Sequence, residues 1–129
     1  MSADPNPLRF DAETLGLLDP RREVRIVTTR PDGTQRRTII WVVVDGGDVF
    51  VRSYKGDRGY WYQAALDRPD EVALIVDDRM IPVRAVPAID EESIRRCSAG
   101  LQAKYRRSMS LLSMLEPQTL ETTMRLDPR

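Results

Sequence analysis

The chain has 129 residues, with 20 Lys and Arg residues against 20 Asp and Glu residues, no histidine and a single cysteine, Cys97. These numbers exclude a catalytic triad or dyad that uses histidine, an imidazole metal ligand, an internal disulfide and a cysteine-rich zinc site. The length and the 41% hydrophobic content predict one folded globular domain, and the zero net charge gives no general attraction to nucleic acid or to an anionic membrane.

The N-terminal lead is polar and contains Pro5 and Pro7, without a basic region followed by an apolar stretch, so we expect no signal peptide. The longest apolar run, residues 39–44, is far shorter than the roughly 20 residues that span a bilayer. We therefore predict a cytoplasmic protein without membrane contact. We divide the chain into a lead with a short helix, residues 1–22, and a single domain, residues 23–129.

The first half of the chain predicts a short helix and then three strands. Asp11 is a suitable N-cap for the helix, which ends before Pro20. Alternating or continuously apolar patterns predict three strands, which cover residues 23–30, 38–44 and 49–54. A Pro-Asp-Gly turn separates the first two strands, and a Gly-Gly turn separates the second from the third. Because both turns are tight, we predict that the three strands form an antiparallel meander.

The second half predicts a helix over residues 60–68, a hairpin and further helices. The hairpin strands cover residues 72–76 and 80–88. The second of them contains Pro82 and Pro87, which lack an N–H group, so we expect this strand at a sheet edge or with bulges.

Asp90 then begins a longer helix, and residues 109–115 and 122–126 predict a helical segment, closed by Pro117, and a final strand. The buried stripe of the longer helix consists of Ile94, Cys97, Leu101 and Tyr105. The order of all these elements predicts a mainly β fold with helices (α+β): a small antiparallel barrel with helical caps.

Cations and hydroxyl groups gather where the second predicted strand begins and the third ends. They are Arg36, Arg37, Thr38, Arg52, Ser53, Tyr54 and Lys55, followed by Gly56, Arg58 and Gly59. Antiparallel pairing would bring both groups to one end of the meander. Glycine-rich backbone, cations and the start of the next helix could hold a phosphate there. Solvated charges at a barrel rim are the alternative, and the residues leave both interpretations open.

Most of the aromatic side chains lie within 22 positions of one another. They are Trp41, Tyr54, Tyr60, Trp61 and Tyr62, and they could stack on a planar ring or simply fill the core. The acidic pairs and triplets are explained by a turn and a helix start, so we predict no metal site. Arg-Arg pairs are scattered among acidic residues, which does not indicate a nucleic-acid groove.

Three segments of the chain resemble the flavin- and deazaflavin-binding split barrels, the superfamily of pyridoxamine-phosphate-oxidase-like proteins and deazaflavin-dependent nitroreductases. The segments are Arg30-x-x-Gly33-x-x-Arg36-Arg37-Thr38-Ile-Ile-Trp41, Val49-Phe-Val-Arg-Ser-Tyr-Lys-Gly56 and Trp61-Tyr-x-x-Ala65-Leu66-x-x-Pro69-x-x-Val72. The C-terminal residues 114–129 look like those of a narrower family of short bacterial split-barrel proteins of unassigned function.

The resemblance implies a homodimeric split β-barrel with FMN or a deazaflavin in a groove near the dimer interface. The residues that match the cofactor-binding segments are Arg36, Arg37, Thr38, Arg52, Ser53, Tyr54, Lys55, Arg58 and Trp61. The chain departs from the deazaflavin enzymes where Ile39-Ile40-Trp41 replaces a Pro-Leu region, and we expect the bulk of Trp41 to narrow the groove.

Two functions follow from this resemblance. The first is an oxidoreductase for a small molecule, in which a bound flavin or deazaflavin supplies the hydride chemistry and no histidine is needed. The second is a non-catalytic homodimer that has lost the cofactor, has a groove filled by Trp41, and binds a small ligand or serves as an accessory protein. The sequence identifies neither a catalytic residue nor a substrate.

Overall fold

The structure is a computed structural model, and it describes residues 9–129; most of the polar lead, residues 1–8, lies outside the described residues. Its helices are α1 (Ala12–Leu18), α2 (Tyr60–Asp67), α3 (Glu91–Lys104), α4 (Leu111–Met114) and α5 (Pro117–Leu120), with a 3-10 turn, η1, at Gly56–Arg58. Its strands are β1 (Val24–Thr29), β2 (Gln35–Ile40), β3 (Val43–Asp45), β4 (Asp48–Val51), β5 (Val72–Val76), β6 (Arg79–Pro87) and β7 (Met124–Pro128). The predicted α+β fold class is confirmed.

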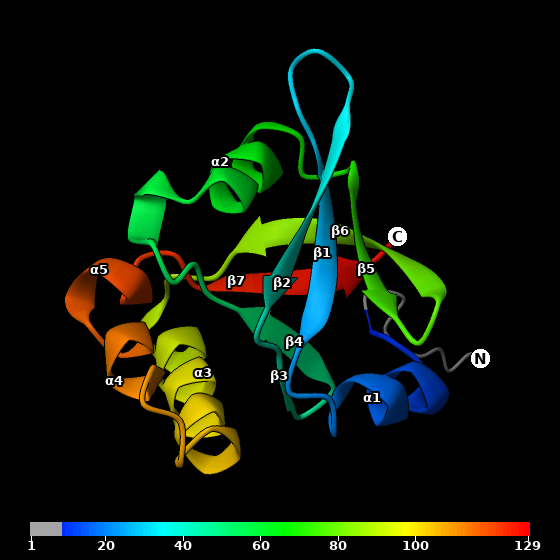
Figure 1. Ribbon diagram of the computed structural model, residues 1–129. Coiled ribbons are helices and arrows are strands. Elements are labelled where there is room, and N and C mark those ends of the chain that lie inside the picture. The colour runs from blue at the N-terminus through cyan, green and yellow to red at the C-terminus, as the bar shows by residue number, and fades with distance from the viewer. Residues whose placement is uncertain (1–8) are drawn as a thin grey trace.

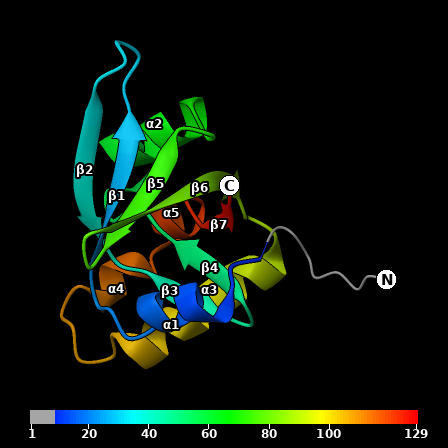
Figure 2. The ribbon, with the colours of Figure 1, turned by 90° about the vertical axis from the view of Figure 1, so that its right-hand side faces the viewer.

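All seven strands form one antiparallel sheet in the order β2-β1-β5-β6-β7-β4-β3. The sheet is curled into a half-barrel (Figures 1 and 2). Its two edge strands, β2 and β3, are consecutive in the chain and are joined by Trp41 and Val42 alone. We call this two-residue connection the seam, because it links the two edges of the curled sheet.

The predicted meander is wrong, although both of its hairpins are present. The apolar run 38–44 is divided at the seam: β2 pairs with β1, whereas β3 pairs with β4. The other neighbour of β4 is β7, with Phe50 opposite Arg125. Tight turns determine only the pairing of consecutive strands, and the curl of the whole sheet decides that β2 and β4 do not pair.

The sequence predicts the proline-containing strand at a sheet edge or with bulges, and the edge position is wrong, because β6 lies between β5 and β7. Its two neighbours are staggered, so that residues 79–83 pair with β5 and residues 83–87 pair with β7. Pro82 and Pro87 therefore each lie in a half-strand that has one partner. A missing N–H group is tolerated there, since one side of the half-strand has no ladder.

The predicted helix starts are confirmed by their caps. The carboxylate of Asp11 accepts a hydrogen bond from the N–H of Thr14 at 2.8 Å, and that of Asp90 accepts one from Ser93 at 3.0 Å. The sequence predicts that Pro117 closes a helical segment, whereas in the structure Pro117 is the first residue of the short helix α5. The N–H group at the first position of a helix makes no hydrogen bond within the helix, so proline, which lacks this group, is tolerated there.

Two hydrophobic clusters lie on opposite faces of the curled sheet. The first fills its inside and includes Leu18 of α1 with Trp61 and Ala65 of α2. The second packs α3 against β3 and β4. A Cβ at Gly100 would collide with Val43, so glycine permits the close approach of α3, which brings its last residues to the seam. Within residues 9–129, the helices all lack the length and apolar character needed to cross a membrane.

Candidate functional site

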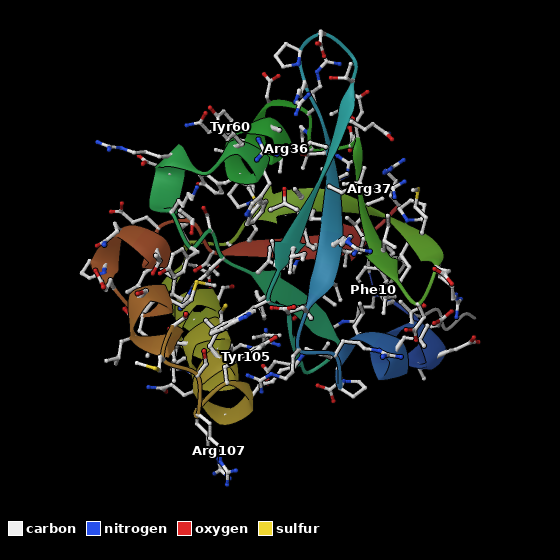
Figure 3. The ribbon with its side chains drawn as sticks, in the orientation of Figure 1. Phe10, Arg36, Arg37, Tyr60, Tyr105 and Arg107 are labelled. Carbon is white, nitrogen blue, oxygen red and sulfur yellow. The ribbon has the colours of Figure 1, made fainter. Side chains whose placement is uncertain are left out.

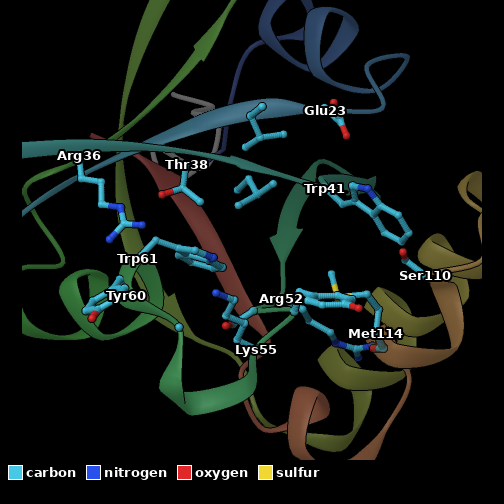
Figure 4. Close-up of a pocket in the computed structure, with 15 residues that line it drawn as sticks. Glu23, Arg36, Thr38, Trp41, Arg52, Lys55, Tyr60, Trp61, Ser110 and Met114 are labelled. Carbon is cyan, nitrogen blue, oxygen red and sulfur yellow. The ribbon is translucent and has the colours of Figure 1, made fainter.

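A cavity of about 400 Å³ lies between β2 and the segment that follows β4, at the start of α2 (Figure 4). Its size is typical of small-molecule sites. The residues that line it are Glu23, Arg36, Thr38, Ile39, Ile40, Trp41, Arg52, Ser53, Tyr54, Lys55, Gly59, Tyr60, Trp61, Ser110 and Met114.

Most of the site residues expected from the sequence line this one cavity. They are Arg36, Thr38, Arg52, Ser53, Tyr54, Lys55 and Trp61. They meet because the sheet curls, since β2 and β4 are not paired as the meander required. Arg37 and Arg58 do not line the cavity. Arg37 is exposed, and its side chain points to the face of β2 opposite to that of Arg36 and Thr38. Arg58 is exposed in η1.

Two buried hydroxyl groups of this cavity have no hydrogen-bond partner. They belong to Thr38 and Ser53, and they are the two such buried side-chain atoms found among residues 9–129. Ser53 is only 1% exposed. A buried hydroxyl without a partner is unfavourable, so a ligand atom that reached either oxygen would supply the missing hydrogen bond.

The start of α2 lies directly beside Ser53. Gly59 is the N-cap of this helix, and no side chain caps its first N–H groups. A Cβ at Gly59 would collide with the Ser53 hydroxyl oxygen as it is placed here, so glycine permits this close approach. The free N–H groups of a helix N-terminus favour an anion, and the unpartnered Ser53 hydroxyl lies at the same place.

The cavity has an excess of positive charge. Arg36, Arg52 and Lys55 line it, against one carboxylate, that of Glu23. None of the three cations takes part in the salt bridges found among residues 9–129. The guanidinium of Arg36 instead lies over the ring of Tyr60, 4.8 Å from its centre (Figure 3). Tyr60 lines the cavity and is largely exposed, which places this pair at the cavity mouth.

The guanidinium of Arg52 is buried and is used by the protein itself. It donates from Nε to the hydroxyl of Thr123 at 2.8 Å, and from its two other nitrogens to the carbonyl oxygens of Met114 and Ile94 at 3.1 and 2.8 Å. Burial lowers the pKa of Arg52. This side chain therefore holds β4, α3, α4 and the start of β7 together, and it adds positive potential to the cavity wall.

Trp41 lies at the other end of the cavity from Arg36, next to Ser110 (Figure 4). Its indole stacks on the ring of Tyr105, with 4.0 Å between the ring centres and 3° between the planes. The expectation that the bulk of Trp41 narrows the groove stays a prediction, since the indole forms part of the cavity wall. Of the other aromatic residues, Trp61 and Tyr62 are buried in the core, and Tyr60 is 70% exposed.

Ser110 and Met114 line the cavity although the sequence did not indicate them. They come from the segment that leads into α4 and from α4 itself, more than fifty positions after Ser53 in the chain. No local pattern marks them, and only the packing of α4 beside β4 brings them to the cavity. The thiol of Cys97, in contrast, is buried, with its pKa raised to about 11 by burial, as expected of an unreactive core residue.

A family model that describes uncharacterized proteins conserved in bacteria, DUF2255, matches residues 14–126. The chain belongs to this family. No curated protein matches it.

Several solved structures share the fold. A conserved hypothetical protein from Mycobacterium tuberculosis aligns with a TM-score of 0.69 and 14% identity, over 99% of this chain and 85% of that one. An F420-H2-dependent reductase aligns with a TM-score of 0.59 and 18% identity, over 83% and 94%. A putative pyridoxamine 5′-phosphate oxidase from Listeria innocua aligns with a TM-score of 0.63 and 13% identity, over 91% and 90%. The split-barrel fold implied by the resemblance is thereby confirmed, and identities this low establish the fold alone.

Proposed function

We propose that this family member binds a phosphate-bearing flavin-type cofactor, FMN or a deazaflavin, in the cavity, and acts as an oxidoreductase on a small molecule. The observation that carries the proposal is the unpartnered Ser53 hydroxyl at the uncapped start of α2. Such an arrangement favours an anion with several acceptor oxygens, which a phosphate provides. The F420-H2-dependent reductase and the putative oxidase share the fold, which agrees with this assignment.

The residues of the cavity fit such a group and can be given roles. Ser53, Thr38, Lys55 and the first N–H groups of α2 would hold the phosphate, with Arg36 at the mouth. Arg52 would keep the wall in place through its three hydrogen bonds. Arg37 and Arg58, which lie outside the cavity, would contribute only through long-range positive potential. The cofactor itself would supply hydride transfer, and the chain would bind, orient and shield it.

We also propose that the protein is a homodimer whose second copy covers the cavity mouth. Three residues that line the cavity expose large apolar surfaces: Ile39 at 57%, Tyr54 at 56% and Tyr60 at 70%. A second copy would remove this surface from water and complete the pocket for the substrate.

The proposal is tested by titrating the purified protein with FMN, FAD and a deazaflavin while cofactor fluorescence and calorimetry are recorded. We expect FMN or the deazaflavin to bind, and the Ser53→Ala and Lys55→Ala variants to bind it about tenfold more weakly without loss of stability. Arg58→Ala removes an exposed cation outside the cavity and should change the affinity by less than about twofold. A folded protein that binds none of the three cofactors contradicts the proposal; if it still binds phosphate esters, it is a non-catalytic small-ligand protein.

A further inference from the structure

The seam between β2 and β3 is held by Lys104, the last residue of α3, and by Tyr105, the C-cap of that helix. The N–H of Val42 donates to the hydroxyl oxygen of Tyr105 at 3.2 Å, and the ammonium of Lys104 donates to the carbonyl oxygen of Val42 at 2.8 Å. The same Tyr105 hydroxyl donates to the carbonyl oxygen of Arg22 at 2.6 Å. The backbone that carries Trp41 is therefore fixed from the end of α3 at the connection between the two edge strands, which do not pair with each other.

The indole of Trp41 is fixed as well. Tyr105, on which it stacks, is 0% exposed. The cationic groups of Arg22 and Lys104 lie 5.2 and 5.5 Å from the centre of the tyrosine ring. Trp41 itself is only partly buried and lines the cavity. An aromatic side chain that is held in one orientation before binding loses little conformational entropy when a ligand stacks on it.

Arg36 and Trp41 lie at opposite ends of the cavity, and aromatic side chains are present at both ends, because Tyr60 and Trp61 lie near Arg36 (Figure 4). The cavity's single carboxylate, that of Glu23, is drawn near Trp41. The anionic end of a ligand is therefore favoured near Arg36 and away from Glu23, which leaves a planar ring at Trp41.

From these observations we infer that Trp41 is the platform on which the planar ring of the ligand stacks, and that Tyr105 is the residue that positions this platform. The inference rests on the proposed function and adds to it the direction in which the ligand lies: its anion at Ser53 and the start of α2, its ring on Trp41. The competing role for Trp41 is packing alone, which would affect stability without any preference between the two ends of a ligand.

Two probes separate the ends of the ligand: riboflavin, which carries the ring without a phosphate, and inorganic phosphate. In Trp41→Leu we expect riboflavin and FMN to bind about tenfold or more weakly, and phosphate to bind within about twofold of wild type. Trp41→Phe keeps a ring on Tyr105 and should restore part of the lost affinity. Ser53→Ala should show the opposite pattern, with weakened phosphate binding and riboflavin binding within about twofold.

Tyr105→Leu tests the positioning role, because it removes the ring on which the indole stacks while residue 41 remains tryptophan. We expect weakened riboflavin binding with unchanged phosphate binding, whereas a merely structural role would weaken both. The inference is overturned if Trp41→Leu leaves riboflavin affinity unchanged, or if it weakens both probes equally; FMN binding to wild type would then still support the proposed function. If wild type binds none of riboflavin, FMN and the deazaflavin, the proposed function itself fails, and the ring platform with it.

Discussion

The Nε of Arg52 donates to the hydroxyl oxygen of Thr123 over 2.8 Å, and both side chains are almost completely buried. The guanidinium reaches three neutral acceptors on three segments of the chain, and within residues 9–129 it has no carboxylate partner. A buried cation without a counter-charge is unfavourable, so the three hydrogen bonds of the planar guanidinium must compensate for its loss of hydration.

Replacing Arg52 with Lys should therefore destabilise the protein although the charge is retained. A lysine ammonium cannot reach three acceptors in the geometry of a guanidinium, and we expect the free energy of unfolding to fall by about 2–4 kcal/mol. Urea unfolding followed by circular dichroism measures it. The matched control is Arg58→Lys on the exposed turn η1, which should change stability by less than about 0.5 kcal/mol. Equal effects of the two substitutions on the free energy of unfolding would show that the guanidinium geometry of Arg52 is unimportant for stability.

Replacing Thr38 with Val should stabilise the protein in the absence of ligand, by up to about 1 kcal/mol. Valine has nearly the same shape and removes a buried hydroxyl that has no partner. The same change should weaken FMN binding, since the hydroxyl is proposed to serve the phosphate. Thr29→Val is the control: its buried hydroxyl donates to the carbonyl oxygen of Glu71 at 3.2 Å, so this variant should be destabilised in thermal unfolding. A destabilised Thr38→Val would contradict the assignment.

Replacing Tyr105 with Phe should loosen the seam. The phenyl ring still stacks on Trp41, but the buried N–H of Val42 loses its acceptor and the carbonyl oxygen of Arg22 loses its donor. We expect the free energy of unfolding to decrease by about 1–3 kcal/mol. Hydrogen exchange should show the Val42 amide losing protection. Tyr60→Phe, at a 70% exposed position, should have an effect below about 0.5 kcal/mol, and a similar loss there would argue against a specific role of the Tyr105 hydroxyl.

Lys104 should make stability depend on pH in the alkaline range. Burial lowers the pKa of this residue from 10.5 to about 8, against the opposing effect of Asp19, with Arg22 adding to the decrease. Between these two values the unfolded chain binds more protons at this position than the native chain, so the contribution of Lys104 to stability rises as pH increases. Below about pH 8 its buried charge is present in full and stability is lower.

The measurement is urea unfolding of wild type and of Lys104→Met between about pH 7.5 and 9.5, a range that spans the lowered pKa. Burial raises the pKa values of Cys97 to about 11 and of Tyr105 to about 12, so both residues lower stability as pH rises beyond their ordinary values. The difference between the two proteins removes this shared contribution. We expect wild type to gain stability relative to the variant as pH increases, and a difference that does not change with pH would contradict the lowered pKa of Lys104.

Local sequence was enough to place most helices and both early hairpins. Asp11 and Asp90 cap their helices as expected, and Gly46 and Gly47 adopt positive φ angles of 57° and 89° in the turn between β3 and β4. Caps, tight turns and hydrophobic periodicity act between residues that are close in the chain. The cations and hydroxyl groups around Thr38 and Ser53 stand out in the sequence as a candidate site, but they meet through the curl of the sheet and not through the strand pairing that the sequence predicts.

The partners of distant elements were decided by the tertiary structure alone. The apolar run 38–44 gives no sign that it divides at Trp41 and Val42. Its division depends on how the sheet curls around the inner core. It also depends on Lys104 and Tyr105 at the end of α3, which supply the hydrogen bonds that a neighbouring strand would otherwise make. The same packing brings Tyr105 under Trp41 and Ser110 to the cavity. The absence of histidine, a property of the sequence, excludes imidazole chemistry, whereas the cavity itself is formed only when the sheet curls.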